Sequence, residues 1–465
     1  MSELELTLLI DFGSTYTKVT AVDLGQETVI ASAKGPTTVR TDIMQGLEIA
    51  LEDLERKIGG TPAYGRRLAC SSAAGGLSMV TIGLVPELTA EAAKRAALGA
   101  GAKVDRVYAY ELNEKEISEI ESIKPDIVLL SGGTDGGNKT VIRANALKLA
   151  ASKVSAPIVA AGNKAVVDEV TATLRNGGKD VRVADNVMPE IGVLNVDKAR
   201  EVIREVFIDR IIMAKGLKKA EEFVEGILMP TPTSVLNAAG LLARGTKTEP
   251  GLGELMIVDI GGATTDVHTA AWGKPTRGGV LVKGLPEPFL KRTVEGDIGM
   301  RYSIGGIVEA VGTGAISDRN SLPAEAVEKY IEKIKKDVSY LPQTEEEWSI
   351  ELSLAGAGIE VAAVRHAGTL ENVFTPLGEV MVQYGKDLRE ISTVIGTGGV
   401  IVYNERPGKI IENALYSLDR PLSLRPSVPR LFTDSLYLLY AIGLLAEVDR
   451  DKALRIAKKY MKQVQ

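Results

Sequence analysis

Two short segments of the chain join an apolar run to an aspartate and a glycine turn. In the first segment, residues 6–10 are apolar and lead into Asp11-Phe-Gly-Ser-Thr15. In the second, the apolar run 255–258 leads into Asp259-Ile-Gly-Gly-Ala263 and then into Thr264-Thr-Asp-Val267. Apolar runs of this length are typical of buried strands, so each aspartate is expected where a strand ends. A repeated unit of this kind suggests two related lobes.

The residue types in these two Asp–Gly units are suited to binding a polyphosphate together with Mg²⁺. Backbone N–H groups in a glycine turn and nearby hydroxyls donate hydrogen bonds to phosphate oxygens. A carboxylate beside them can hold the water shell of Mg²⁺, which prefers one or two carboxylates and the oxygens of its substrate. Ordinary β-turns also favour Asp and Gly, so one unit alone would be weak evidence. The pair predicts a magnesium polyphosphate site.

We expect both glycine turns to contact phosphate groups, and we expect three aspartates to take part in catalysis. The predicted phosphate ligands are Gly13, Ser14, Thr15 and Lys18 in the first unit and Gly261, Gly262, Ala263, Thr264 and Thr265 in the second. The predicted catalytic residues are Asp11, Asp259 and Asp266, and the predicted metal ligands are Asp11 and Asp259.

A third glycine-rich segment, Thr393-Val-Ile-Gly-Thr-Gly-Gly-Val400, follows an apolar run late in the chain. Bare glycine backbone permits a base or a ribose to lie against it. We therefore predict that Gly396, Gly398 and Gly399 contact an adenosine. Taken by itself, a glycine turn between a strand and a helix explains this segment equally well.

Residues 100–188 alternate short apolar runs with helical segments. The predicted strands are 106–110, 126–130, 157–160 and 181–183, and the predicted helices are 114–123, 139–151 and 164–174. This alternation requires a parallel sheet covered by helices, and we interpret it as an insertion in the first lobe. The loop Ser131–Asn138 is interpreted as a turn with a helix cap by Asn138 or Thr134, with a phosphate cradle as the alternative.

The strongest linker signal is the segment Gly245-Thr-Lys-Thr-Glu-Pro-Gly-Leu-Gly253. It predicts a first lobe over residues 1–245, which includes the insertion at about 100–188, and a second lobe over 246–429. Proline-rich sequence ends the second lobe, and we expect C-terminal helices over 430–465 to return to the first lobe.

Composition excludes several classes of protein. The net charge of −6 and the pI near 5.4 disfavour nucleic acid as a partner, because binding its phosphates requires a basic face. Cys70 is the only cysteine, so one chain holds no disulfide or cysteine-rich metal site, and we interpret it as a buried structural thiol. His268 and His366 are not at metal spacing, and we interpret them as a packing residue and a helix-end residue.

The sequence also predicts a cytoplasmic protein with no membrane contact. The N-terminal residues are acidic where a signal peptide is basic. The most apolar helical stretch, 436–445, is much shorter than the roughly 18 residues that a membrane span requires.

Five segments, in order, resemble the motifs of the superfamily that contains actin, the sugar kinases and the heat-shock chaperones. Leu8–Lys18 and Met256–Thr269 resemble its two phosphate motifs, and Val394–Val400 resembles its adenosine motif. Pro232–Gly240 and Asp434–Leu445 resemble its two connecting helices. The resemblance implies a two-lobed actin-like (ribonuclease H-like) α/β ATPase fold with an inserted α/β domain, and ATP or ADP with Mg²⁺ as ligands.

Two residues depart from that pattern. Thr231 stands where the chaperone ATPases carry a glutamate before their proline–threonine pair, and Ala263 replaces the third glycine of the second phosphate motif. The missing carboxylate would orient the attacking water, so we expect slow hydrolysis, or catalysis by a different acid such as Asp266.

Four segments point to one family within this superfamily: Asp11-Phe-Gly-Ser-Thr-Tyr-Thr-Lys18, Cys70-Ser-Ser-Ala-Ala-Gly-Gly-Leu77, Leu130-Ser-Gly-Gly-Thr-Asp-Gly-Gly137 and Thr293-Val-Glu-Gly-Asp-Ile-Gly299. With them, the whole chain is similar to the MutL accessory family of coenzyme-B12-dependent glutamate mutase. The resemblance implies a reactivating ATPase that acts beside an adenosylcobalamin-dependent mutase, whose subunits would be its partners.

Two other functions stay open at this point, as does the oligomeric state. A small-molecule kinase shares the fold and would need a base aspartate, for which Asp135 and Asp185 are the candidates. A scaffold protein would use the nucleotide only as a structural ligand. The first motif also resembles ATPases that activate 2-hydroxyacyl-CoA dehydratases, but those hold an iron–sulfur cluster with paired cysteines, and Cys70 is alone.

Overall fold

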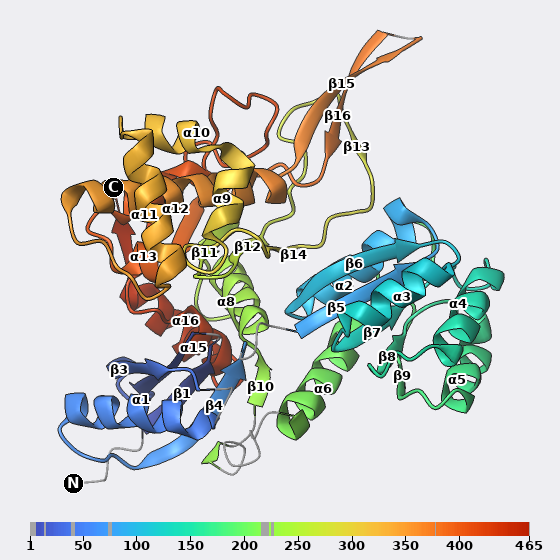
Figure 1. Ribbon diagram of the computed structural model, residues 1–465, viewed down its shortest axis with the longest axis horizontal. Coiled ribbons are helices and arrows are strands. Elements are labelled where there is room, and N and C mark those ends of the chain that lie inside the picture. The colour runs from blue at the N-terminus through green and yellow to red at the C-terminus, as the bar shows by residue number, and fades with distance from the viewer. Residues whose placement is uncertain are drawn as a thin grey trace. The chain divides into compact units, whose positions relative to one another are not determined.

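The computed structural model describes residues 6–13, 15–38, 42–72, 77–214, 223–224, 227–376 and 378–464 (Figure 1). The chain divides into two compact units. Unit 1 comprises Met1–Ser234 and Gly284–Pro286, and unit 2 comprises Val235–Lys283 and Glu287–Gln465.

Unit 1 begins with a five-stranded sheet in the order β10-β4-β1-β2-β3. Neighbours β1, β2 and β3 are antiparallel, whereas β4 runs parallel to β1 and β10 parallel to β4. Helix α1 begins where the Asp42 side chain accepts a hydrogen bond from Met44 N at 3.0 Å. The bounds are β1 (Leu6–Phe12), β2 (Tyr16–Asp23), β3 (Thr28–Pro36), α1 (Ile43–Ile58), β4 (Tyr64–Ser71) and β10 (Ile227–Pro230).

A second sheet of unit 1 forms the inserted domain, and its five strands are all parallel in the order β6-β5-β7-β8-β9. Buried side chains of α2 and α6 belong to the cluster on one face, and those of α3, α4 and α5 to the cluster on the other. The bounds are β5 (Leu77–Gly83), α2 (Glu91–Gly99), β6 (Ala102–Ala109), α3 (Glu114–Ile123), β7 (Ile127–Leu130), α4 (Thr140–Ala151), β8 (Ile158–Ala160), α5 (Val167–Asn176), β9 (Val181–Val183) and α6 (Asp197–Ala214), with short turns of helix η1 (Pro86–Ala90) and η2 (Lys164–Val166).

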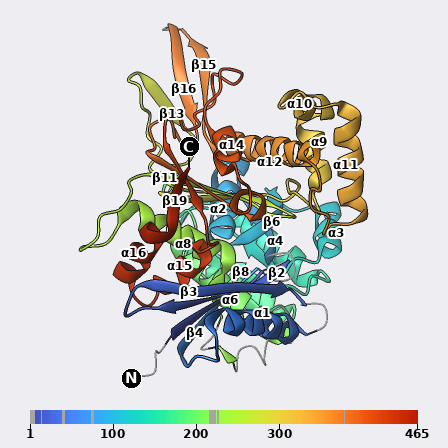
Figure 2. The same cartoon turned by 90° about the vertical axis from the view of Figure 1, so that its left-hand side faces the viewer.

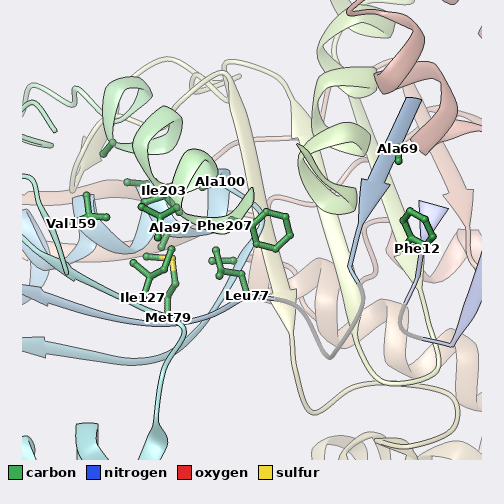
Figure 3. Close-up of a cluster of buried hydrophobic side chains, with 14 of the residues drawn as sticks. Phe12, Ala69, Leu77, Met79, Ala97, Ala100, Ile127, Val159, Ile203 and Phe207 are labelled. Carbon is green, nitrogen blue, oxygen red and sulfur yellow. The ribbon is translucent and has the colours of Figure 1, made fainter. Parts of the chain in front are cut away.

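The parallel sheet predicted for the insertion is confirmed, but it includes β5 and α2, which precede the predicted start near residue 100. Helix α2 had a weak signal because it buries alanines rather than large side chains. Figure 3 shows Met79 and Ile127 from the sheet beside Ala97 of α2 and Phe207 of α6. Small alanines allow α2 to pack closely on this sheet.

Unit 2 contains a six-stranded sheet in the order β14-β12-β11-β17-β18-β19. Neighbours β11, β12 and β14 are antiparallel, β17 is parallel to β11, and β18 is parallel to β17. Five of these strands, from β14 to β18, repeat the order and directions of β3-β2-β1-β4-β10 in unit 1, so the topology is duplicated. Strand β19, antiparallel to β18, is an additional edge strand. This is the two-lobed ribonuclease H-like α/β arrangement that the sequence predicted. The bounds are β11 (Leu255–Ile260), β12 (Thr265–Ala270), β14 (Leu290–Glu295), β17 (Thr393–Thr397), β18 (Arg430–Asp434) and β19 (Met461–Val464).

Helices cover the sheet of unit 2, and the longest is α12 (Glu345–His366). Its cap Thr344 accepts a hydrogen bond from Glu347 N at 3.2 Å. A Cβ at Gly358 would lie 3.1 Å from Ile260 Cδ1, so glycine brings the helix close to β11. The other helices of this part of the chain are α8 (Thr231–Arg244), α9 (Ile304–Val311), α10 (Thr313–Asp318), α11 (Ala324–Lys336), α13 (Gly399–Val402), α14 (Pro407–Ile411), η3 (Glu412–Ala414), α15 (Leu439–Leu445) and α16 (Arg450–Tyr460).

A three-stranded sheet that the sequence analysis did not predict projects from the helices of unit 2 (Figures 1 and 2). It has the order β13-β16-β15, with β13 (Val280–Lys283), β15 (Thr369–Thr375) and β16 (Gly378–Tyr384). Its apolar runs, Val280-Leu-Val282 and Val380-Met-Val382, are only three residues long, and its residues are largely exposed. Such short runs do not mark a buried strand.

The C-terminal segment differs in part from the helices expected there. Helix α16 ends at Tyr460, and β19 then pairs antiparallel with β18 inside unit 2. The predicted lobe boundaries, and the return of the C-terminal helices to the first lobe, stay predictions. Within the described residues, no helix combines the length and the apolar character needed to cross a membrane.

Candidate functional site

The carboxylate of Asp11 lies at the end of β1, 1% exposed, and contacts three side chains of unit 1. The strand register places it opposite Lys18 on β2 and Cys70 on β4. Lys18 Nζ lies 3.1 Å from Asp11 Oδ2, and Thr231 Oγ1 donates to Oδ1 at 2.6 Å. The sequence-predicted pair of Asp11 and Lys18 is therefore brought together, and the lysine compensates the buried negative charge.

The turn after Asp11 is closed by backbone contacts. Gly13 N donates to Tyr16 O at 3.1 Å, and Thr37 Oγ1 donates to Gly13 O at 2.7 Å. A Cβ at residue 13 would lie only 2.5 Å from Tyr16 O, so this position requires glycine. Thr15 is exposed beside it, whereas the predicted ligand Ser14 lies outside the described residues.

Thr231 and Cys70 complete the surroundings of Asp11. Thr231 is the first residue of α8, and its hydroxyl lies 3.5 Å from Cys70 Sγ. Burial, and then the negative charge of Asp11, raise the pKa of the Cys70 thiol well above its usual value. Cys70 is fully buried, as predicted for a structural thiol. The role of Thr231 was missed, because no pattern in the sequence pairs it with Asp11.

In unit 2, Asp259 lies opposite Asp266 on β12 and opposite Thr397 on β17. The turn that follows it is closed where Gly261 N donates to Thr264 O at 2.9 Å. The loop after β14 packs against this turn: a Cβ at Gly299 would lie 2.5 Å from the carbonyl carbon of Ala263. The predicted phosphate ligands of the second unit thus form one braced turn.

The hydrogen bonds that hold this turn in place are accepted by its backbone carbonyls, and three of its amides stay available. The amides of Arg301 and Tyr302 both donate to Gly262 O at 2.8 Å. In contrast, the amides of Gly262, Ala263 and Thr264 have no hydrogen-bond partner in the described part of the chain. These three residues are partly exposed. Consecutive amides of this kind form a concavity suited to phosphate oxygens.

Asp266, the third predicted catalytic residue, is engaged in a salt bridge. Arg292 Nε donates to Asp266 Oδ1 at 2.7 Å, and Arg292 Nη2 lies 2.6 Å from the same oxygen. Thr264 Oγ1 donates to the other oxygen, Oδ2, at 3.3 Å. Proton transfer by Asp266 would therefore have to use Oδ2.

The three glycines of the third motif differ in what surrounds them. A Cβ at Gly398, where φ is 102°, would lie 2.2 Å from Ile260 O, and a Cβ at Gly396 would lie 2.5 Å from Ile411 Cδ1. A Cβ at Gly399 would meet no other part of the chain within 4 Å, so only there does the missing side chain leave open space. Gly398 brings this motif beside the end of β11, one residue from Asp259.

Both histidines are buried in unit 2 and are held neutral. Burial, the largest effect, lowers the pKa of His268 to about 4, with Arg292 acting in the same direction and Asp266 opposing it. His366 is the last residue of α12, as predicted, and its ring nitrogens lie 3.0 Å from Thr269 Oγ1 and 2.8 Å from Thr293 Oγ1. Burial also lowers the pKa of His366 well below its usual value.

The glycine loop of the inserted domain is built from internal hydrogen bonds. Asn138 Oδ1 accepts from Val141 N in the first turn of α4 at 3.1 Å, although the N-cap residue itself is Lys139 and not the predicted Asn138 or Thr134. Asp135 Oδ1 accepts from Lys164 N at 3.0 Å and from Asn186 Nδ2 at 2.9 Å. Burial opposes ionisation of Asp135, but the bonds from Asn186 and Lys164 prevail and lower its pKa. These contacts favour a structural role over that of a base.

Comparison with known proteins gives one extensive match of sequence. A family model described as "MutL protein" matches residues 7–461. Protein MutL of Clostridium tetanomorphum is 50% identical over 461 residues, which is 98% of this chain and 99% of that protein.

Solved structures match this chain at lower sequence identity. A glycerol dehydratase reactivase is 13% identical, with 95% of this chain and 99% of that chain covered and a TM-score of 0.35. The ethanolamine utilization protein EutJ of Carboxydothermus hydrogenoformans is 11% identical, with 97% and 89% covered and a TM-score of 0.30. At these TM-scores the likenesses carry no argument about function.

The family match extends from β1 to the start of β19 and therefore contains both Asp–Gly units and the third glycine motif. The chain belongs to the MutL protein family.

Proposed function

We propose that the protein binds Mg-ATP or Mg-ADP through its two Asp–Gly units. The observation that supports this most directly is the run of three amides at Gly262, Ala263 and Thr264, which have no partner in the described part of the chain. Amides in such a turn donate to phosphate oxygens without the entropy cost of ordering side chains. Gly399, with open space around it, is the best candidate to contact the adenosine.

The residues present fit a hydrated magnesium ion. Asp11 and Asp259 would contact its water shell, and Lys18 would balance the remaining charge beside Asp11. The structure shows no group of three or more candidate ligands among the His, Cys, Asp and Glu residues it describes. Mg²⁺ is commonly held by one or two carboxylates, water and substrate phosphates. When bound, the ion would neutralise charge on the phosphates.

Hydrolysis by the isolated protein is proposed to be slow. The hydroxyl of Thr231 is hydrogen-bonded to Asp11, so residue 231 supplies no carboxylate to orient a water molecule. We expect turnover well below the enzyme median of about 10 per second, with acceleration by a partner or by closure around the nucleotide.

The partner that we propose is an adenosylcobalamin-dependent mutase such as glutamate mutase, which this protein would reactivate in an ATP-dependent manner. The support is membership of the MutL family together with the two Asp–Gly turns at the ends of β1 and β11. If the mutase binds the ATP state more tightly, then by linkage it must also tighten ATP binding, typically by about 1–3 kcal/mol.

The test combines inactivated mutase, carrying damaged cobalamin, with this protein, ATP, Mg²⁺ and fresh coenzyme. We expect recovery of mutase activity that requires ATP and is lost in Asp259→Asn. Recovery without ATP would contradict the proposal. Phosphorylation of a sugar or an acid, with no effect on any mutase, would favour the kinase alternative.

A further inference from the structure

Arg425 is a fully buried arginine whose guanidinium is only partly hydrogen-bonded. It lies in the segment between η3 and β18 of unit 2, and its side chain is among the largest that are buried there. Its Nη1 donates to Asn413 O at 3.2 Å. Its Nε and Nη2 are buried and have no partner in the described part of the chain. A buried donor without an acceptor destabilises the folded state, and more so when it is charged.

A second arginine, Arg319, lies against the same asparagine. It follows α10, and its Nη1 donates to Asn413 Oδ1 while its Nη2 donates to Glu360 Oε2. The Nε of Arg319 is buried and, like the Nε of Arg425, has no acceptor in the described structure. Asn413 therefore holds two guanidinium groups, which together have three donor nitrogens without a partner among the described residues.

The surrounding charges leave an excess of positive charge. The charged groups that act on Arg425 are Glu360, Asp419, Arg420 and Arg319. Including Arg425, three guanidinium groups thus face two carboxylates. Burial, the largest effect, lowers the pKa of Arg425, and its two arginine neighbours act in the same direction. An anion at this position would relieve both the repulsion and the unpaired donors.

Lys386, another fully buried cation of unit 2, shows how the fold satisfies such a group with protein atoms alone. Its Nζ donates to Ala271 O at 2.8 Å, to Phe289 O at 2.9 Å and to Thr269 Oγ1 at 3.3 Å. Arg425 has only one such contact within the described residues, to Asn413 O. The difference points to an acceptor other than the described residues of the chain.

We propose that Arg319 and Arg425 form a binding site for a small oxyanion, either a carboxylate or a phosphate. The adjacent Nε and Nη2 of Arg425 form the planar fork that binds two oxygens of such a group. The side chains of Arg319 and Arg420 are 24% and 54% exposed, so the cluster extends from the buried Arg425 to the protein surface. None of these residues belongs to the two Asp–Gly units or to the third glycine motif.

The experiment measures thermal unfolding of the full chain in phosphate, in acetate and in chloride at equal ionic strength. For the wild type we expect a saturable rise of about 3 °C in phosphate or acetate relative to chloride. The more effective anion identifies the source as a phosphate or a carboxylate. Arg425→Met should abolish the rise. The matched control Arg406→Gln removes the same charge from an exposed arginine and should retain it.

A rise in melting temperature caused by anions at the glycine turns would persist in Arg425→Met. The variant therefore distinguishes the proposed arginine site from the proposed nucleotide site. If Arg425→Met does not fold, Arg319→Met, at a partly exposed position, provides the same comparison. Direct titration calorimetry of the wild type with phosphate and with acetate should show heat of binding at one site. Equal behaviour in all three salts, with no heat, would mean that water fills the cluster and would overturn the proposal.

Discussion

Thr231 donates a hydrogen bond of 2.6 Å to Asp11 Oδ1. The two residues are far apart in sequence. Strand β10 leads directly into α8 and pairs with β4, which pairs with β1, so the start of α8 lies beside the end of β1. The replacement of the glutamate found in chaperone ATPases therefore has a structural consequence. Residue 231 supports the carboxylate that is proposed to face the metal, instead of acting on water itself.

Removing this hydroxyl should destabilise unit 1. In Thr231→Val the buried carboxylate of Asp11 loses a donor, and hydrogen bonds to charged groups contribute about 1.5–3 kcal/mol. We expect urea unfolding to show a loss of about 2 kcal/mol. Thr231→Ser retains the hydroxyl and should lose much less. Equal stability of the valine and serine variants would contradict the role assigned to Thr231.

Alanine substitutions at Gly398 and Gly399 should differ in their effects: the first should lower stability, and the second should mainly weaken nucleotide binding. In Gly398→Ala the Cβ meets the Ile260 carbonyl at a φ of 102°, so we expect a loss of more than about 2 kcal/mol of stability. Gly399→Ala meets no other part of the chain within 4 Å, so its stability should change by less than about 1 kcal/mol. Nucleotide binding should nevertheless weaken in Gly399→Ala. Unchanged affinity there would remove Gly399 from the proposed site.

Cys70 should report on opening of the region around Asp11, because it is the only thiol in the chain. It is fully buried, and burial together with Asp11 raises its pKa, so little thiolate forms near neutral pH. We expect labelling by a disulfide reagent in mildly alkaline buffer to be slower on the order of a thousandfold in the native protein than in urea. Comparable rates would show that the edge between β1 and β4 opens readily.

Stability should fall as the pH is lowered from about 7.5 to about 5. His268 has a folded pKa of about 4, below the value of about 6.5 expected when it is unfolded, so the unfolded chain binds more protons in this range. The resulting loss near pH 5 is about 2 kcal/mol, and His366, whose pKa is also lowered, should add to it. His268→Leu should reduce the loss by about that amount. An identical pH dependence in the variant would contradict this assignment.

The sequence predicted those parts of the fold in which hydrophobic pattern and turn chemistry agree. Strands β1 and β11 are continuous apolar runs that end in Asp–Gly turns, and both are found. Helix α2 was missed because most of its buried residues are alanines, and β13 was missed because its apolar run, Val280-Leu-Val282, is only three residues long. In such segments the spacing of the apolar residues gives little indication of the secondary structure.

The contacts around the site could not be predicted from the sequence, because they depend on tertiary structure. The bond between Thr231 and Asp11 joins the start of α8 to β1, and the strand before α8, β10, is linked to β1 only through β4. Arg292 reaches Asp266 across the pair β12–β14. Sequence spacing cannot report such pairings. Gly299 is an intermediate case: the segment that contains it carried the family resemblance, but its packing against Ala263 is visible only in the structure.

Binding of one magnesium nucleotide is proposed to use both Asp–Gly units. Its most direct test is the melting temperature of the wild type, Asp11→Asn and Asp259→Asn with ADP or ATP, each with and without Mg²⁺. A ligand at about 100 times its Kd adds roughly 2.7 kcal/mol, so the wild type should gain several degrees when Mg²⁺ is present. Each variant should fold and lose most of this gain. A wild type that no nucleotide stabilises at millimolar concentration, or variants that retain the full magnesium-dependent gain, would contradict the account.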